Sequence, residues 1–297
     1  MTLPAPVRAA VERELTRLDG RDTQVSRVRA VGGGCISPGA RIETEQGDRH
    51  FVKWAMPGDA PASLFTEEAR SLRALNETAA VRVPQVRAAG EQWLLLEWLE
   101  PGAPRAGTWA ALGRALAALH GTKADAFGWV ADNFIGTLPQ PNSQSARWWT
   151  FWAERRLLPQ FTRARQRAFF DGGDQRAFDR LVGRLEELLE PADADGPSLL
   201  HGDLWGGNVH VTESGDAALI DPSSYHGHRE VDLAMAELFG GFGAPFFDAY
   251  REAWPLAPGY DQARRELYQL YYVLVHVNLF GAAYVAGTRR VLQKFGG

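Results

Sequence analysis

The residues best suited to chemistry lie in the segment HGDLWGGN, residues 201–208, and at Asp221 after a short apolar run. Phosphoryl transfer from ATP needs a carboxylate that accepts the proton of the attacking hydroxyl, and oxygen ligands that hold Mg²⁺ against the phosphates. Asp203, Asn208 five positions later and Asp221 supply these groups. We therefore predict Asp203 as the catalytic base, and Asn208 and Asp221 as magnesium ligands. A polar loop with turn-forming Asp and Asn residues is the alternative.

A lysine within an apolar strand is the second candidate. Lys53 lies between Val52 and Trp54, and strand alternation places its side chain on the opposite face from both. In an ATP site such a lysine binds the α- and β-phosphates and is fixed by a glutamate from the following helix. We expect Glu68 to be that glutamate, with Glu67 as its rival. A surface lysine whose stem lies along apolar neighbours is the alternative.

Two backbone segments could bind the rest of a nucleotide. Residues 31–39 are rich in glycine, so the N–H groups at Gly33 and Gly34 could approach phosphate closely. This segment departs from G-x-G-x-x-G and lacks the Lys-Ser/Thr end of a Walker A loop, so a plain connection between strands explains it equally well. Glu97 and Leu99 are expected to form a hinge whose backbone binds adenine.

Two further residues are expected to support the catalytic loop. His201 has no neighbouring group that would join it as a metal ligand, so we expect it to orient the loop by a hydrogen bond. Asp232 begins a predicted helix. It either accepts hydrogen bonds from the backbone of the catalytic loop or caps its own helix, and the sequence leaves both interpretations open.

The elements that position these residues change in character near residue 100. Residues 41–56 predict a hairpin around Gly47 and Asp48, residues 63–75 a helix, and residues 93–100 a buried strand. Beyond residue 102 the pattern is mostly helical, with strand-like material only in residues 199–221. Helices are expected over residues 109–120, 148–167, 176–189, 231–239 and 261–284.

These elements predict an α+β fold with two lobes. Residues 1–99 would form a small, β-rich nucleotide-binding lobe. Residues 100–297 would form a larger, mostly helical lobe that carries catalysis and substrate binding.

Composition excludes several classes of protein. The 297 residues include 32 Lys+Arg and 36 Asp+Glu, a net charge of −4, which argues against a nucleic acid partner. The chain is 45% hydrophobic and 23% charged, which is typical of a folded globular protein.

The longest uncharged stretch, residues 267–288, contains Gln269, His276 and Asn278, so we predict a buried helix and no membrane association. The N-terminal residues carry charges every few positions, unlike a secretory signal.

The single cysteine, Cys35, excludes an internal disulfide and a multi-cysteine zinc site. This use of cysteine fits a reducing compartment, and we expect the protein in the cytoplasm.

Three strings carry a resemblance to a known family: HGDLWGGN, DPSSYHGHREVDLAMAELFGGF and GGGCIS. They resemble the fructosamine/ketosamine kinase family, which is related to the aminoglycoside phosphotransferases within the protein-kinase-like fold. The resemblance covers nearly the whole chain. One departure is Asp-Pro-Ser at residues 221–223, where the family often has Asp-Pro-Ala.

The resemblance implies an ATP- and Mg²⁺-dependent kinase that phosphorylates the sugar 3-hydroxyl of ketosamines. Phosphorylation there destabilises the adduct and releases the amine, which amounts to deglycation. Family members of bacterial type act on ribulosamines or erythrulosamines, and fructosamines are a further candidate. The partners would then be small ketosamines or glycated protein lysines. The resemblance also implies the roles given above for Lys53, Glu68, Asp203, Asn208 and Asp221, and it places Trp205 at the sugar.

The resemblance also includes a cysteine in the glycine-rich loop, which implies that Cys35 could link two chains on oxidation. We expect a monomer that peroxide converts to a linked dimer through Cys35. A small apolar filler is the alternative for this side chain.

Two other functions remain open. The first is a phosphotransferase that acts on an aminoglycoside or another small alcohol. The second is a catalytically inactive kinase-like binding module, which is disfavoured because Lys53, Asp203, Asn208 and Asp221 are all present.

Overall fold

The computed structural model describes residues 2–32, 37–56 and 58–297. The chain forms two compact units. Unit 1 consists of Met1–Thr108 and Val209–Asp221, and unit 2 of Trp109–Asn208 and Pro222–Gly297. Residues 209–221, which the sequence-based division placed in the C-terminal lobe, thus pack with the N-terminal residues. The roles predicted for the two lobes stay predictions.

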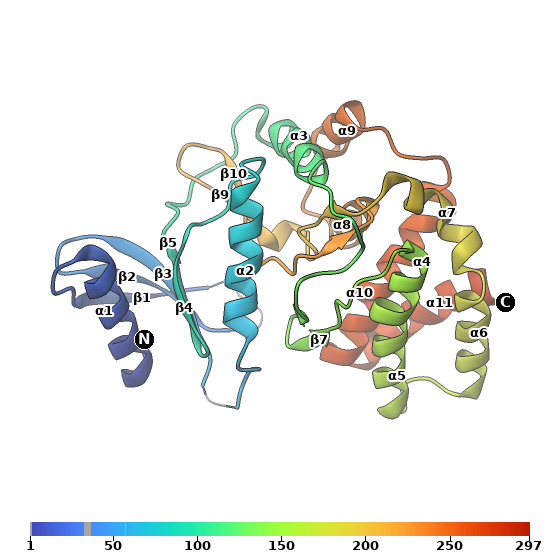
Figure 1. The fold of residues 1–297 in the computed structure, drawn as a ribbon, viewed down its shortest axis with the longest axis horizontal. Helices are drawn as coiled ribbons and strands as arrows, with labels where there is room; N and C mark the ends of the chain where they lie inside the picture. Colours follow the sequence, from blue (N-terminus) through green and yellow to red (C-terminus); the bar gives the residue numbers. More distant parts are fainter. Residues whose placement is uncertain (1, 33–36, 57) are drawn as a thin grey trace. The chain divides into compact units, whose positions relative to one another are not determined.

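Unit 1 is built on a five-stranded antiparallel sheet of order β1-β2-β3-β5-β4. Figure 1 shows helices α1 and α2 on opposite sides of this sheet. The bounds are α1 Ala5–Asp19, β1 Val25–Val31, β2 Gly39–Thr44, β3 Arg49–Trp54, α2 Leu64–Glu77, β4 Val86–Gly90 and β5 Trp93–Glu97. The predicted hairpin, the helix after it and the buried strand are therefore confirmed.

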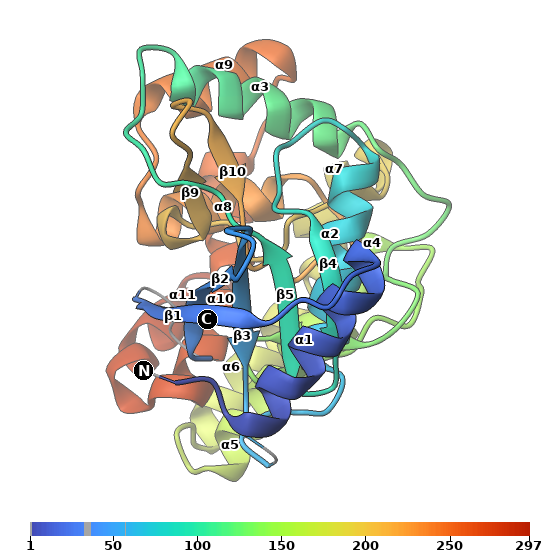
Figure 2. The ribbon, with the colours of Figure 1, turned by 90° about the vertical axis from the view of Figure 1, so that its left-hand side faces the viewer.

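Helix α1, which the sequence analysis did not identify, covers one face of the sheet. Val7, Val11 and Leu15 recur every fourth residue, so they share one helix face and are buried. They belong to one apolar cluster with Val52 and Trp54 of β3. Figure 2 shows α1 lying across the strands. Because side chains alternate along a strand, Lys53 faces the opposite side of the sheet from α1.

A small hairpin from later in the chain completes unit 1. Strands β9 (Val209–Val211) and β10 (Ala217–Leu219) pair in antiparallel fashion. The Gly102 N–H donates to the Val211 carbonyl at 2.9 Å, and the Leu219 N–H donates to the Arg82 carbonyl at 2.8 Å. These bonds fix Asp221, which follows β10, within unit 1.

Unit 2 is mostly helical, with two short two-stranded sheets, β6–β7 and β8–β11. The small antiparallel sheet and the larger helical part confirm the predicted α+β class. The bounds are α3 Thr108–His120, β6 Asn133–Ile135, β7 Leu138–Gln140, α4 Trp148–Phe151, π-helix η1 Trp152–Leu157, α5 Leu158–Gln166, α6 Gly172–Val182, α7 Leu185–Asp195, β8 Ser198–Leu199, 3₁₀-helix η2 Gly206–Asn208, β11 His226–Gly227, α8 Glu230–Phe239, α9 Ala244–Ala253, π-helix η3 Tyr260–Arg264, α10 Arg265–Phe280, 3₁₀-helix η4 Ala282–Tyr284 and α11 Val285–Gly296.

Two of the expected helices are interrupted. The helix predicted over residues 176–189 is wrong as a single element, because α6 ends at Val182 and α7 begins at Leu185. A capping box of Asp171 and Asp174 starts α6 earlier than predicted. In the same way α10 ends before Gly281, whose φ of 89° suits glycine and breaks the helix expected to reach residue 284.

Helix α10 lies in the core of unit 2 and packs against α5, α8 and α11. Three large aromatic side chains of the unit are fully buried: Tyr268 of α10, Trp148 of α4 and Trp152 of η1. The uncharged stretch around α10 is thus explained by packing inside the unit. Within residues 2–32, 37–56 and 58–297, none of the helices has the length and apolarity that crossing a membrane requires.

Candidate active site

Unit 1 brings Lys53, Glu68 and Asp221 together. Lys53 Nζ donates to both carboxylate oxygens of Glu68 and to Oδ1 of Asp221, each at 2.9 Å. The side chains of Lys53 and Glu68 are each 11% exposed. Burial lowers the pKa of Lys53, but the charges of Asp221 and Glu68 outweigh burial and raise this pKa, so the ammonium stays charged. The rival Glu67 pairs with Arg70 instead.

Asp221 has an uncommon backbone conformation. Its φ is 55°, in the left-handed region, which Asp tolerates better than most residues. Such strain often accompanies a functional site. Within the described part of the chain, Lys53 is the hydrogen-bond donor found on the Asp221 carboxylate, at Oδ1. The side chain is 36% exposed, so its second oxygen is available to a cation.

In unit 2, Asp203 and Asn208 contact each other directly. The Asn208 amide nitrogen donates to the Asp203 carbonyl at 2.8 Å and to Asp203 Oδ2 at 3.2 Å. The Asn208 N–H also donates to the Trp205 carbonyl at 2.9 Å, which closes the short helix η2. With its nitrogen bound to Asp203, the Asn208 amide has its oxygen as the atom that could ligate a metal.

The residue before Asp203 is held from several directions. Asp232 Oδ1 accepts from the Gly202 N–H at 2.9 Å, and Oδ2 accepts from the His201 N–H at 2.7 Å. Tyr272 donates its hydroxyl to the Gly202 carbonyl at 2.8 Å. Gly202 has a φ of +84°, and a Cβ there would lie 2.1 Å from the Ser223 carbonyl oxygen, so a larger residue would displace the loop. The backbone at Asp203 is therefore fixed by buried groups.

Asp232 itself is held by a histidine that the sequence analysis missed. His120 Nε2 lies 3.2 Å from Asp232 Oδ2, and His120 Nδ1 lies 2.8 Å from the Tyr250 hydroxyl. All three side chains are fully buried. Burial lowers the pKa of His120, which favours the neutral ring. Because a carboxylate only accepts, the proton belongs on Nε2 and Tyr250 donates to Nδ1. No local pattern could reveal this, since His120 and Asp232 are 112 residues apart.

Trp205 and His201 lie in the same loop. A Cβ at Gly207 would lie 2.2 Å from the Trp205 ring, so glycine is needed where this ring folds over the backbone. The Gly206 N–H donates to the Gly240 carbonyl at 3.1 Å, which joins the loop to the end of α8. His201 is fully buried, and its Nδ1 accepts from the Asp203 N–H at 3.3 Å. The contact of Trp205 with a sugar stays a prediction.

The predicted adenine hinge follows β5. Glu97 is the last residue of this strand, and its carboxylate accepts from Arg82 and from the Gln85 N–H. Leu99 is half-buried. The binding of adenine by this backbone stays a prediction. Three further candidates, Gly33, Gly34 and Cys35, lie outside the described residues.

The donor set fits magnesium better than a transition metal. In the part of the chain that the structure describes, no group of three or more His, Cys, Asp or Glu side chains could hold a metal ion. Asp221 and Asn208 offer oxygen atoms, which Mg²⁺ prefers, and Mg²⁺ commonly relies on one or two protein ligands together with substrate phosphates. Each of the two residues therefore offers an oxygen of the type that Mg²⁺ prefers, and their joint binding of one ion stays a prediction.

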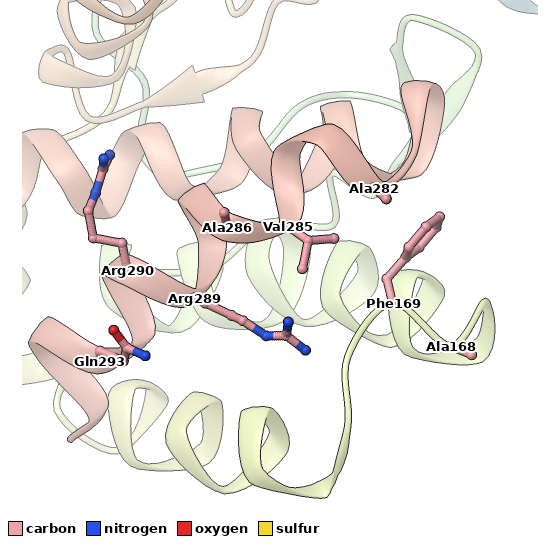
Figure 3. Close-up of a pocket in the computed structure, with 8 residues that line it drawn as sticks. All are labelled: Ala168, Phe169, Ala282, Val285, Ala286, Arg289, Arg290 and Gln293. Atoms are coloured by element: carbon pink, nitrogen blue, oxygen red, sulfur yellow. The ribbon is translucent and has the colours of Figure 1, made fainter.

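One pocket of unit 2 is lined by other residues. It has a volume of about 610 Å³ and is lined by Phe169, by Val285 and Arg289 of α11, and by their neighbours. Figure 3 shows these side chains around it. Arg289 pairs with Asp174 at 2.8 Å. None of the predicted site residues lines this pocket.

Comparison with known proteins gives a consistent result. A family model described as fructosamine kinase matches residues 7–295. A probable ketoamine kinase of Synechocystis sp. is 39% identical over 297 residues, covering 98% of this chain and 97% of that protein. The chloroplastic protein-ribulosamine 3-kinase of Arabidopsis thaliana is 36% identical over 290 residues, covering 95% of this chain and 86% of the relative.

Solved structures agree on the fold. A protein from Thermobifida fusca, named as a fructosamine-3-kinase, has a TM-score of 0.83 at 38% identity, with 96% of this chain and 99% of that chain covered. Macrolide and aminoglycoside phosphotransferases at 18% and 12% identity have TM-scores of 0.59 and 0.57, which shows a shared fold alone. The predicted kinase-like fold is thus confirmed.

Proposed function

The chain belongs to the fructosamine kinase family, and from this premise we propose that it transfers the γ-phosphate of ATP to the 3-hydroxyl of ketosamines. One observation carries the proposal most directly. Lys53 is buried against Glu68 and Asp221, which is the arrangement that kinases use to hold ATP phosphates.

The residues of unit 1 are proposed to bind the nucleotide. The Lys53 ammonium offers charge-assisted hydrogen bonds to phosphate oxygens, and Glu68 fixes its direction. Asp221 and, in unit 2, Asn208 are the proposed ligands of Mg²⁺. Mg²⁺ held by these residues would supply positive charge against the phosphates.

The residues of unit 2 are proposed to prepare the acceptor. Asp203 accepts the proton of the sugar hydroxyl while the hydroxyl oxygen of the sugar forms a bond to the γ-phosphorus. The bond from this phosphorus to the β-phosphate oxygen breaks and releases ADP. The Asn208 amide donates to the Asp203 carboxylate and orients it. Asp232 fixes the backbone on which Asp203 is carried. Each of these residues therefore has a distinct task.

The substrate class is proposed from the relatives and from Trp205. The relatives are named as ketoamine and ribulosamine kinases. The Trp205 ring offers an apolar face, which suits a neutral sugar better than a polycation. Ribulosamines and erythrulosamines are the proposed substrates, with fructosamines as a further candidate, and the proposed role is deglycation of small ketosamines or of protein lysines. We also propose that the protein works in the cytoplasm, which its single cysteine fits. It is proposed to be a monomer that oxidation converts to a dimer linked through Cys35.

A substrate panel tests this proposal. Purified protein would be given ATP, Mg²⁺ and lysine adducts of ribose, erythrose or glucose, with kanamycin as the aminoglycoside. ADP release measures turnover, and ³¹P and ¹³C NMR of the product locates the phosphate. We expect turnover on the ribose and erythrose adducts and phosphate on the 3-hydroxyl. Turnover on kanamycin alone would support the aminoglycoside alternative, and no turnover on any acceptor would support an inactive module.

A further inference from the structure

We propose that unit 1 carries a second binding site, on the α1 side of its sheet, that takes a small zwitterion of the α-amino acid class. The site is a pocket of about 470 Å³ formed by the end of α1, the β2–β3 turn and the adjoining ends of β3, β4 and β5. His50 lines it from β3, on the same strand face as Val52 and Trp54. It therefore lies on the opposite face of the sheet from Lys53.

The first observation is the state of His50. This side chain is only 7% exposed, and neither ring nitrogen has a hydrogen-bond partner among the residues that the structure describes. A buried polar group without a partner costs stability, so native proteins almost always satisfy such groups. An apolar residue would continue the packing of Val52 and Trp54 at no such cost. The imidazole at this position therefore has two hydrogen-bonding atoms that the described residues leave unsatisfied.

The second observation is the charge of the lining. Arg21, Arg49 and Arg87 face the same space as Asp19, Asp48 and Glu97. Arg49 also pairs with Glu100, and Glu97 with Arg82. Because guanidinium and carboxylate groups line the pocket in equal numbers, a lone anion or a lone cation would meet like charges as well as opposite ones. A zwitterion can pair with both signs.

The arginines retain donors for a ligand. Arg21 contacts Asp48 through one nitrogen at 3.1 Å. Arg87 lies 4.0 Å from Asp19, which is too long for a good hydrogen bond. A guanidinium has five N–H donors, so most of those on Arg21 and Arg87 remain for an incoming carboxylate.

The protonation state of His50 fits the same class of ligand. Burial lowers its pKa, and so does Arg87, while Asp19 and Asp48 raise it. The net direction is downward, so the ring is neutral near pH 7. A neutral imidazole has one N–H donor and one acceptor nitrogen. These two atoms match the carboxylate and the ammonium of an α-amino acid.

Binding of L-glutamine tests the proposal, because its side chain is neutral and its only charges are those of the zwitterion. Isothermal titration would compare wild type with His50→Phe and Arg87→Leu. Arg73→Leu is the matched control, since Arg73 lies in unit 1 on α2 and lines a different pocket. We expect both pocket variants to raise the Kd at least tenfold and Arg73→Leu to leave it unchanged. Equal binding by wild type and both pocket variants, or no binding by wild type, would overturn the proposal.

Two further measurements identify the ligand class and guard against misfolding. N-acetyl-glutamine lacks the ammonium and glutamine methyl ester lacks the carboxylate, so each should bind at least tenfold more weakly than L-glutamine. If either binds as tightly, the site does not select a zwitterion and the proposal fails. Circular dichroism would confirm that each variant is folded, and Arg87→Leu decides the question if His50→Phe does not fold. Neither assay depends on kinase activity.

Discussion

Lys53 Nζ lies 2.9 Å from Asp221 Oδ1, although 168 residues separate the two in the chain. The β9–β10 hairpin makes this contact possible, because it leaves the C-terminal part of the sequence and packs within unit 1. The segment that packs within unit 1 begins just after Asn208 and ends at Asp221. Both proposed magnesium ligands thus lie where the chain passes from one unit to the other.

Replacing Lys53 tests the proposed phosphate contact. Lys53→Met removes the ammonium and leaves Glu68 and Asp221 without their shared partner. We expect kcat/KM for ATP to fall by about 100-fold, since fixed charges near a transferring phosphoryl group typically contribute this much. Lys294→Met is the control, because Lys294 pairs with Glu266 on α10 of unit 2. A Lys53→Met protein with wild-type kcat/KM would rule out this role.

The neighbouring glutamates provide a matched comparison. Glu68→Gln keeps the size of the side chain but removes the charge that directs Lys53, so kcat/KM for ATP should fall by about tenfold or more, as for loss of a buried charge-assisted hydrogen bond. Glu67→Gln changes the residue next to it, which pairs with Arg70, and should leave kcat/KM unchanged. ADP release at several ATP concentrations measures both. Equal losses in the two variants would contradict the assignment.

Asp232→Asn tests the support of the catalytic loop. The oxygen of the new amide can still accept one of the two hydrogen bonds from the His201 and Gly202 N–H groups. Its NH₂ group only donates, so the other hydrogen bond is lost and two donors face each other. We expect the free energy of unfolding to fall by about 3 kcal/mol, since this is the loss of a buried hydrogen-bonded charge. Because the backbone at Asp203 also loosens, kcat should fall while KM for ATP changes little. Urea titration and initial rates measure the two effects, and an unchanged kcat in folded protein would argue against positioning.

Local patterns were enough to predict the β2–β3 hairpin and α2, because alternation and turn residues are short-range signals. They also placed Lys53 on the correct strand face. The division between α6 and α7 was missed because apolar spacing continues across Gly183, which caps the end of α6, and α7 begins two residues later at Leu185. The contact of His120 with Asp232 depends on packing between distant helices, which no single-sequence pattern encodes.

Acid should destabilise the protein below about pH 6.5. Burial is the main cause that lowers the pKa of four histidines: His50, His120, His226 and His276. The unfolded chain binds protons near pH 6.5 while these folded residues do not, so stability is present above that pH and falls as the pH falls, by up to about 1.4 kcal/mol per pH unit for each histidine.

Urea titrations at pH 7.5, 6.5 and 5.5 measure this dependence. A His276→Gln variant should show a shallower slope, because it removes one of the four groups. Asp195 affects stability in a separate pH range. Burial raises the pKa of Asp195, but His228 and Arg229 outweigh burial and lower this pKa to about 2. Its contribution would be lost only as the pH falls from about 4 through about 2. Constant stability from pH 7.5 to 5.5 would refute the histidine prediction.

The most direct test is the rate of Asp203→Asn on a ribulosamine of Nα-acetyl-lysine, followed by ADP release with saturating ATP and Mg²⁺. Removing a general base should lower kcat by about 10²- to 10⁴-fold while KM for ATP changes by less than about threefold. Asp216→Asn, in the β9–β10 turn, should retain wild-type kcat. If Asp203→Asn turns over the same acceptor at the wild-type rate, Asp203 is not the base and the proposed mechanism is wrong.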